Sequence, residues 1–331
     1  MNKKITAIFA ALIMVLAIYV PIVAAQDIPT TASVTGAGTP PVIETIFVLD
    51  DNGDTTHVTP GTQILPVPGS GANEVQTTFW KYAIVTDGNG IADITKVEEY
   101  LTKADGVDTP LVTTTQVTEY TEAMGILNRA LAQDVITQAE YDSAKFKLDP
   151  TKLSAKMYKI ENSLCNCDEP GVITVHFKAI DKSGLTTFAT EGFDLLSIMA
   201  FETDFDGIDY GTILVGVEQY IAGDDVWAMP GPSGENLNTI KNQGNTQFQI
   251  SVQASDLSNG ETPAQYIDAE HLSVELLGEH VYDLSTVKVL AGYLQPCTPT
   301  QMSFDITAPD GTSAGSYSGA VYLTIVSNNV A

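Results

Sequence analysis

The sequence predicts an all-β protein built from two β-sandwiches in tandem, the first of which carries a short helical insertion. Two observations support this prediction. In the first half, residues 77–94 and 169–184 are runs in which side chains alternate with period two and which end in turns rich in Gly, Asn, Asp or Ser. In the second half, short apolar runs are separated at close intervals by turn residues. Both patterns are typical of strands with one buried face.

The two alternating runs are expected to form central strands of the first sandwich. The first, at 77–86, leads into the turn 87–90, and the second, at 172–181, follows a Pro-Gly pair. Further strands of this half are predicted from similar patterns at 41–50, 92–101, 156–162 and 185–198.

A helical pattern interrupts these strands. Apolar residues recur at helical spacing in 119–135, and Thr137 with Glu140 forms a capping-box signature that opens a second short helix before Pro150. A helical pair this short is marginal in water, so we expect its apolar face to dock on the sandwich. The first domain is therefore predicted at 42–200, with the insertion at about 116–150.

The second domain is predicted at 201–331. Seven short strands are expected there, which is the count and spacing of an Ig-like sandwich. They are predicted at 212–221, 236–241, 247–254, 272–277, 286–290, 301–306 and 317–326.

The N-terminus contains the parts of a secretory signal peptide. A basic start, an uncharged apolar run and a small-residue cleavage site follow one another in residues 1–25, as Lys3 and Lys4, 5–20, and 23–25. We expect cleavage before Gln26; the alternative is an uncleaved anchor, because 5–25 approaches the length of about 20 residues that spans a bilayer. Residues 26–41, rich in Thr, Gly and Pro, are predicted to be a flexible linker.

Several segments resemble Ig-like modules, of the PKD-like or bacterial Ig type, in archaeal and bacterial surface proteins. The resemblance is carried by PVIE at 41–44, TDGNGIADI at 86–94 and EPGVITVHFKAIDKSG at 169–184. The second half is similar to the N-x-G-N type of Ig-like domain, through the segments at 210–213, 240–245 and 315–319. The resemblance implies a surface location and a class of role, but no activity, since such folds host many functions.

Charge narrows the range of partners. Lys and Arg number 15 against 41 Asp and Glu, which gives a formal net charge of −26. Such a surface repels nucleic acid and anionic membranes and attracts cations. We therefore expect no nucleic-acid partner, and membrane contact only through the N-terminal segment if it is retained.

Three cysteines leave one unpaired. Cys165 and Cys167 are too close in an extended chain for an easy mutual bridge, so one of them is expected to pair with Cys297 and leave a thiol over. A zinc site at the C-x-C pair is the alternative, although it lacks a second C-x-C or a His pair.

No catalytic motif is found, and we expect no enzymatic activity. The four histidines, His57, His176, His271 and His280, do not lie at metal-ligand spacing. Residues 315–319 miss the nucleophile-elbow motif because Tyr317 stands at its centre. No cofactor is expected to be required.

Acidic turns are the recurring site-like feature, and calcium is the ion that suits them. Calcium takes six to eight oxygen ligands, and short loops that concentrate carboxylates supply them. The candidate ligands are Asp87, Asn89 and Asp93 in one loop and Asp204, Asp206 and Asp209 in another. The second loop lies at the predicted domain junction, where an ion would stiffen the hinge; the alternative is a set of hydrogen-bonded Asx turns.

These observations predict a secreted cell-surface structural or adhesion protein whose partners are other surface proteins or further copies of itself. One alternative is a subunit of an extracellular filament or sheath, in which residues 27–49 add a strand to a neighbour. Another is a carbohydrate-binding module of a secreted enzyme system, with Trp80, Tyr100 or Trp227 as contact residues.

Overall fold

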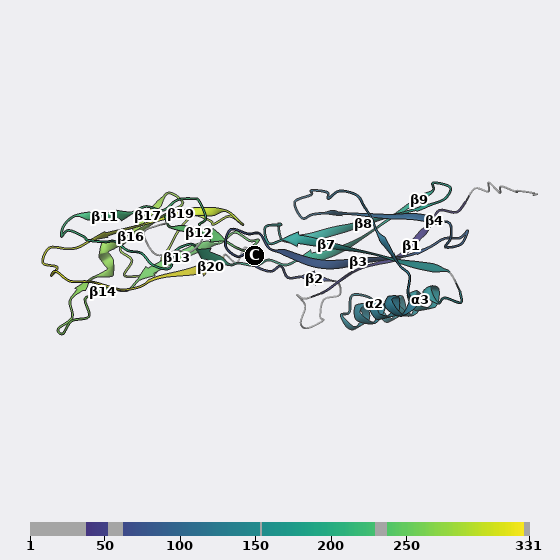
Figure 1. The fold of residues 1–331 in the computed structure, drawn as a ribbon, viewed down its shortest axis with the longest axis horizontal. Helices are drawn as coiled ribbons and strands as arrows, with labels where there is room; N and C mark the ends of the chain where they lie inside the picture. The colour runs from purple at the N-terminus through teal and green to yellow at the C-terminus, as the bar shows by residue number, and fades with distance from the viewer. Residues whose placement is uncertain (1–37, 52–61, 153, 229–236, 328–331) are drawn as a thin grey trace, which may run out of the picture. The chain divides into compact units, whose positions relative to one another are not determined.

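The computed structural model describes residues 38–51, 62–152, 154–228 and 237–327 (Figure 1). Apart from Gly38, these residues belong to one compact unit, Thr39–Ala331. The predicted signal peptide at 1–25, and residues 26–37 of the predicted linker, lie outside the described residues. In the part of the chain that is described, no helix combines the length and the apolar character needed to cross a bilayer.

Strands dominate the fold, and the predicted all-β class is confirmed. The first sandwich has two sheets. One has the order β1 (Val42–Leu49), β3 (Gln76–Thr86), β7 (Ala155–Cys165) and β6 (Thr115–Val117). The other has the order β2 (Gln63–Ile64), β9 (Thr186–Leu195), β8 (Gly171–Asp181), β4 (Ile94–Thr102) and β5 (Val112–Thr113).

The two alternating runs are central strands, as predicted. β3 lies between β1 and β7, and β8 lies between β4 and β9. The inward residues of β8 are apolar and alternate along the strand: Ile173, Val175, Phe177 and Ala179, all buried. They pack with Phe79, Ala83 and other residues of the opposite sheet in a core between the two sheets.

β3 differs from the expectation of one buried face. Residues 81–85 are buried without interruption, because α2 (Tyr120–Ala132) and α3 (Gln138–Leu148) belong to a second core on the other face of the sheet (Figure 1). Tyr82 and Ile84 pack there with Leu127. The predicted docking of the helices is confirmed, and so is the capping box: Glu140 N donates to Thr137 Oγ1, while Thr137 N donates to Glu140 Oε2.

The second sandwich also has two main sheets. The larger one has the order β10 (Phe201–Thr203), β12 (Thr239–Asn242), β19 (Pro299–Thr307), β16 (Leu272–Leu276) and β17 (Glu279–Tyr282), with β11 (Glu218–Ile221) paired to β19. The smaller sheet has the order β18 (Lys288–Val289), β13 (Gln249–Ala254) and β20 (Val321–Val326). The hairpin β14 (Leu257–Ser258) and β15 (Tyr266–Ile267) and the 3₁₀ turn Ala269–His271 complete the described elements.

This sandwich has its own core, built around Phe248, Val252, Val274 and Phe304. Each strand range predicted here overlaps an observed strand. The strands predicted at 212–221 and 317–326 are shorter in the structure, as β11 and β20, and the strand predicted at 301–306 is longer, as β19. The short strands β10, β14, β15 and β17 were not predicted, because two to four residues carry too little periodicity and depend on their partners. The domain boundary near residue 200 stays a prediction, since each sandwich has a separate core while the chain from Thr39 on forms one compact unit.

Candidate functional site

The turn between β3 and β4 holds Asp87 in a fixed position. Its Oδ1 accepts a hydrogen bond from the backbone N–H of Asn89 at 2.7 Å, and its carbonyl accepts one from Gly90 N at 3.0 Å. Asp93 N in turn donates to Gly90 O at 2.9 Å. The Asp-Gly-Asn-Gly sequence therefore forms a tight, internally bonded turn that brings Asp87 and Asp93 to the same end of the first sandwich.

A third carboxylate reaches this turn from a distant part of the sequence. Asp181 is the last residue of β8, and antiparallel pairing sets it opposite Ile94 at the start of β4. Lys182 N donates to Asp93 O at 2.9 Å, which fixes the two segments together. As a result, Asp87, Asp93 and Asp181 each offer a carboxylate oxygen, and these oxygens all lie within 4.8 Å of one another.

Burying the carboxylates of Asp87, Asp93 and Asp181 together without a cation costs free energy. Asp87 is 8% exposed and Asp181 2% exposed, and each has a buried Oδ2 without a hydrogen-bond partner. Among the described residues, no Lys, Arg or His forms an ion pair with the three carboxylates. Two unit charges this close repel by about 3 kcal/mol or more at an effective dielectric constant of 20. The arrangement thus favours a positive ion among the carboxylates.

The remaining predicted ligand of this loop, Asn89, has an exposed side chain. Its Nδ2 lies 3.5 Å from the carbonyl oxygen of Thr39, and it is outside the group of three carboxylates. The sequence thus identified two members of the trio, Asp87 and Asp93, but not Asp181.

The acidic loop at 204–209 is arranged differently. Asp204 is buried, and its carboxylate accepts from Thr239 N at 2.7 Å and from Ala228 N at 3.1 Å. Asp206 and Asp209 are exposed, and Asp209 Oδ1 accepts from Gly211 N at 2.8 Å in an Asx turn. In the described part of the chain, these three do not form a group close enough to share one ion. Asp204 acts as an acceptor for backbone N–H groups.

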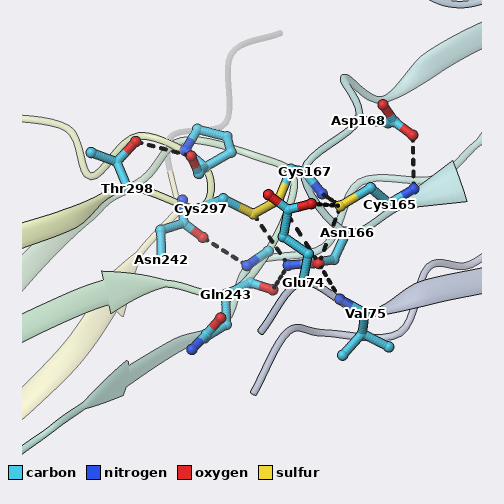
Figure 2. Close-up of a disulfide and its surroundings, with 12 residues drawn as sticks. Glu74, Val75, Cys165, Asn166, Cys167, Asp168, Asn242, Gln243, Cys297 and Thr298 are labelled. Atoms are coloured by element: carbon cyan, nitrogen blue, oxygen red, sulfur yellow. Dashed lines mark hydrogen bonds between the residues drawn. A yellow bond between two sulfur atoms is a disulfide. The ribbon is translucent and has the colours of Figure 1, made fainter. Parts of the chain in front are cut away.

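Cys167 and Cys297 form a disulfide between the two sandwiches, with Cα atoms 5.6 Å apart (Figure 2). The predicted pairing of one member of the C-x-C pair with Cys297 is confirmed. Cys165 keeps a free thiol, whose Sγ lies 3.3 Å from Glu74 Oε2. Burial and the neighbouring Glu74 carboxylate raise the pKa of this thiol. Glu74, Cys165 and Cys167 lie close enough to hold a metal ion, but Cys167 has no thiolate to offer while it is bridged.

Polar contacts surround the disulfide. Asn166, fully buried, donates from Nδ2 to Gln243 O at 3.0 Å and accepts from Val75 N at 2.8 Å (Figure 2). Gln243 Nε2 donates to Gly71 O at 2.9 Å, and Gly71 N donates to Glu202 Oε2 at 2.6 Å. The residue between the two cysteines therefore links both sandwiches, a role that the C-x-C pattern alone did not indicate.

Ser273, His280 and Asp305 form a polar cluster that no sequence motif indicated. Asp305 Oδ2 lies 2.9 Å from Ser273 Oγ and 2.8 Å from His280 Nε2, and the same Nε2 lies 3.2 Å from Ser273 Oγ. A nucleophilic triad needs the histidine to contact the hydroxyl and the carboxylate through different ring nitrogens. Here Nδ1 faces Tyr282 Oη at 2.9 Å. The cluster is a cross-strand polar network of β16, β17 and β19.

An ion pair, Lys81 with Glu99, lies inside the core of the first sandwich and joins its two sheets. Burial lowers the pKa of Lys81 to about 8 although Glu99 attracts its charge, and burial raises the pKa of Glu99. Lys81 stands in β3 between Phe79 and Ala83, which face the same core. Sequence alternation alone could not place this lysine inside.

The fold and these clusters define an all-β, two-sandwich protein with a covalent bridge between the sandwiches and a buried carboxylate trio. No family model matches the chain, and no curated protein matches it. Among solved structures, it is similar to the CsuC–CsuE chaperone–tip adhesion subunit complex of Acinetobacter baumannii, at 11% identity over 80% of this chain and 96% of that chain, with a TM-score of 0.33.

Two further similar structures are a domain of an antigen I/II-family protein and a tip adhesin. The C-terminal domain of the antigen I/II-family protein AspA of Streptococcus pyogenes shares 14% identity over 86% of this chain and 95% of that chain, with a TM-score of 0.25. The CupB6 tip adhesin of Pseudomonas aeruginosa shares 8% identity over 88% of this chain and 91% of that chain, with a TM-score of 0.22. TM-scores this low do not establish a common fold.

Proposed function

We propose that the chain is an exported cell-surface structural or adhesion protein without catalytic activity. The observation that carries the proposal is the Cys167–Cys297 disulfide, which joins residues 130 positions apart. Disulfides persist in oxidising compartments and are rare in a reducing cytosol. A bridge of this span supports export, in agreement with the signal-peptide pattern of the first 25 residues.

The position of the Cys167–Cys297 disulfide suits a mechanical or scaffolding role. It ties the end of β7 to a loop of the second sandwich, next to the Asn166 and Gln243 contacts. Closing so long a loop removes conformational freedom mainly from the unfolded chain, by about 5 kcal/mol in the chain-entropy estimate. Partners are expected to be other surface proteins or further copies of the chain, because a net charge of −26 disfavours nucleic acid and anionic membranes.

The two alternative functions, a filament subunit and a carbohydrate-binding module, gain no specific support. For the filament model, residues 42–49 of the proposed donor segment already form β1 and pair with β3 of the same chain. For the carbohydrate model, Trp80 is half-buried against the helical core, and Tyr100 stacks on His176 with ring centroids 4.3 Å apart. Trp227 is half-buried, with Nε1 shielded from solvent.

The proposal is tested on protein isolated from its native host. Antibody labelling of intact cells should detect the chain at the surface, and N-terminal sequencing should begin at Gln26. Non-reducing peptide mapping should recover the peptide pair that contains Cys167 and Cys297, together with one alkylatable thiol at Cys165. A chain that is found only inside cells, with three alkylatable thiols, would refute the proposal.

Variants separate the bridge from the free thiol. Cys165→Ser should leave surface level and stability unchanged, whereas Cys297→Ser should lower both. If Cys165→Ser is as harmful as Cys297→Ser, the bridge is not the feature that matters.

A further inference from the structure

We propose that the carboxylates of Asp87, Asp93 and Asp181 bind one calcium ion. The three residues come from two segments that are far apart in the sequence, the turn after β3 and the end of β8, and they meet with carboxylate oxygens within 4.8 Å of one another. This convergence depends on the fold, so the ion binds the folded chain and not the unfolded one.

The unpartnered oxygens point to a ligand. In both Asp87 and Asp181 one oxygen is satisfied: Oδ1 of Asp87 accepts from Asn89 N, and Oδ1 of Asp181 accepts from Leu185 N at 2.8 Å. The other oxygen, Oδ2, is buried in each residue without a hydrogen-bond partner. Native proteins rarely leave such atoms unsatisfied, because a buried charged acceptor that has lost water is costly. A cation bound by these carboxylates would give the unpartnered oxygens a ligand.

The donor set selects a hard cation. All the ligands are carboxylate oxygens, which suit calcium and magnesium better than the nitrogen and sulfur ligands that zinc favours. Two oxygens bound to one calcium ion can be up to about 5 Å apart, against about 4 Å around magnesium. The three carboxylate oxygens lie within 4.8 Å of one another, which a calcium shell can accommodate. Asp93, which is half-buried, lies where water can complete the coordination.

Calcium at this position would connect two segments of the first sandwich that are far apart in the sequence. It would hold the turn between β3 and β4 against the last residue of β8, where Lys182 N already donates to Asp93 O. It would also neutralise a cluster that has no protein cation among the described residues. The role does not depend on the surface function proposed above, since it rests on the three carboxylates alone.

Calorimetry on the purified mature protein tests the proposal. The protein is stripped of metal with EDTA, dialysed and titrated with CaCl₂, and separately with MgCl₂. We expect one calcium site with a Kd of about 10⁻⁵–10⁻³ M, from the weakest sensor sites to extracellular modules, and magnesium at least tenfold weaker. In thermal melts, calcium at a hundredfold excess over its Kd should raise the Tm by about 5–11 °C more than NaCl of equal ionic strength.

Charge-matched variants locate the site. Asp181→Asn and Asp87→Asn each keep an oxygen that can accept the existing backbone hydrogen bond, and each should weaken calcium binding at least tenfold and abolish the calcium-specific Tm shift. Asp206→Asn removes one negative charge from the exposed loop of the second sandwich. This variant should leave the calcium affinity and the calcium-specific Tm shift unchanged. If either buried variant fails to fold, Asp93→Asn replaces it with the same expected result.

Three results would overturn the proposal. The first is equal Tm shifts in calcium and sodium, which would mean general screening of the acidic surface. The second is wild-type protein that takes up no calcium in the titration. The third is Asp206→Asn losing as much calcium affinity as Asp181→Asn, which would place the ion in the other loop.

Discussion

The two sandwiches use buried carboxylates in different ways. In the first sandwich, Asp87, Glu99 and Asp181 each leave one buried oxygen without a hydrogen-bond partner. In the second, neither Asp204 nor Asp305 leaves a buried oxygen unpartnered, among the residues that the structure describes. Both sandwiches therefore bury acidic groups, but only the first keeps unsatisfied lone pairs on them.

The difference separates carboxylates that act as hydrogen-bond acceptors from carboxylates that need a cation. Asp204 binds two backbone N–H groups, and Asp305 binds a hydroxyl and an imidazole. Glu99 has Lys81 as its cation. The Asp87, Asp93 and Asp181 trio has no such protein partner in the described residues, which is why a metal ion is inferred there and not at Asp204.

Removal of the protein cation should have the largest effect. Lys81→Met leaves Glu99 buried without its partner and should reduce the free energy of unfolding by about 3–5 kcal/mol. Denaturant unfolding at neutral pH measures the change.

The double variant Lys81→Met/Glu99→Leu is the matched control. Because it removes both charges and fills the space with apolar groups, it should be within about 1 kcal/mol of wild type or more stable. If the double variant is as unstable as the single one, packing rather than the unpaired charge explains the loss.

Removal of the acceptor at Asp204 should have the next largest effect. Asp204→Ala leaves the buried N–H of Thr239 without its charged acceptor and should cost about 2–4 kcal/mol, measured by urea unfolding. The calcium-specific Tm shift should persist. Asp209→Ala, at the exposed turn of the same loop, should cost less than about 1 kcal/mol. If Asp204→Ala loses the calcium-specific Tm shift, the 204–209 loop takes part in calcium binding, and the proposed difference between the two loops is wrong.

The buried ion pair also predicts a pH dependence. The pKa of Lys81 is about 8 in the folded chain against 10.5 for an ordinary lysine. Between these values the unfolded chain binds a proton that the folded chain has released, so stability should rise with pH, by up to about 1.4 kcal/mol per pH unit. Urea unfolding at pH 8 and pH 9.5 should show this rise in wild type and a smaller one in Lys81→Met/Glu99→Leu. Equal slopes in the two proteins would contradict it.

The smallest effect is expected for Asp181→Asn without calcium. Removing one of three neighbouring negative charges relieves repulsion, but the buried amide group of the new side chain has no partner. Because the two effects largely offset, the variant should be only about 0.5–1 kcal/mol more stable than wild type in EDTA. In saturating calcium the order should reverse. A variant that is less stable than wild type under both conditions would indicate that Asp181 is a structural acceptor like Asp204.

Local sequence patterns predicted much of the fold. Alternation placed β3 and β8 as central strands, and Thr137 with Glu140 located the start of α3. These features depend on neighbours within a few residues. The double-sided burial of β3 was not predicted, because the helices that cover its outer face come from a separate part of the chain.

The candidate site was only partly predictable for the same reason. Asp87 and Asp93 share one turn and were identified by composition. Asp181 joins them through the antiparallel register of β4 and β8, which includes an irregularity between Ile94 and Lys96. The place of the 204–209 loop at the predicted domain junction favoured it as a calcium site, since sequence cannot show that Asp204 is already bonded to Thr239 and Ala228.

A crystal structure of the mature protein grown in millimolar calcium tests the calcium site most directly. We expect an ion within about 2.3–2.6 Å of carboxylate oxygens from Asp87, Asp93 and Asp181, and none at Asp204. The same crystals should show the Asp204 carboxylate still bound to Thr239 N. Density for calcium in the 204–209 loop, or a well-ordered trio that holds no ion, would contradict this expectation.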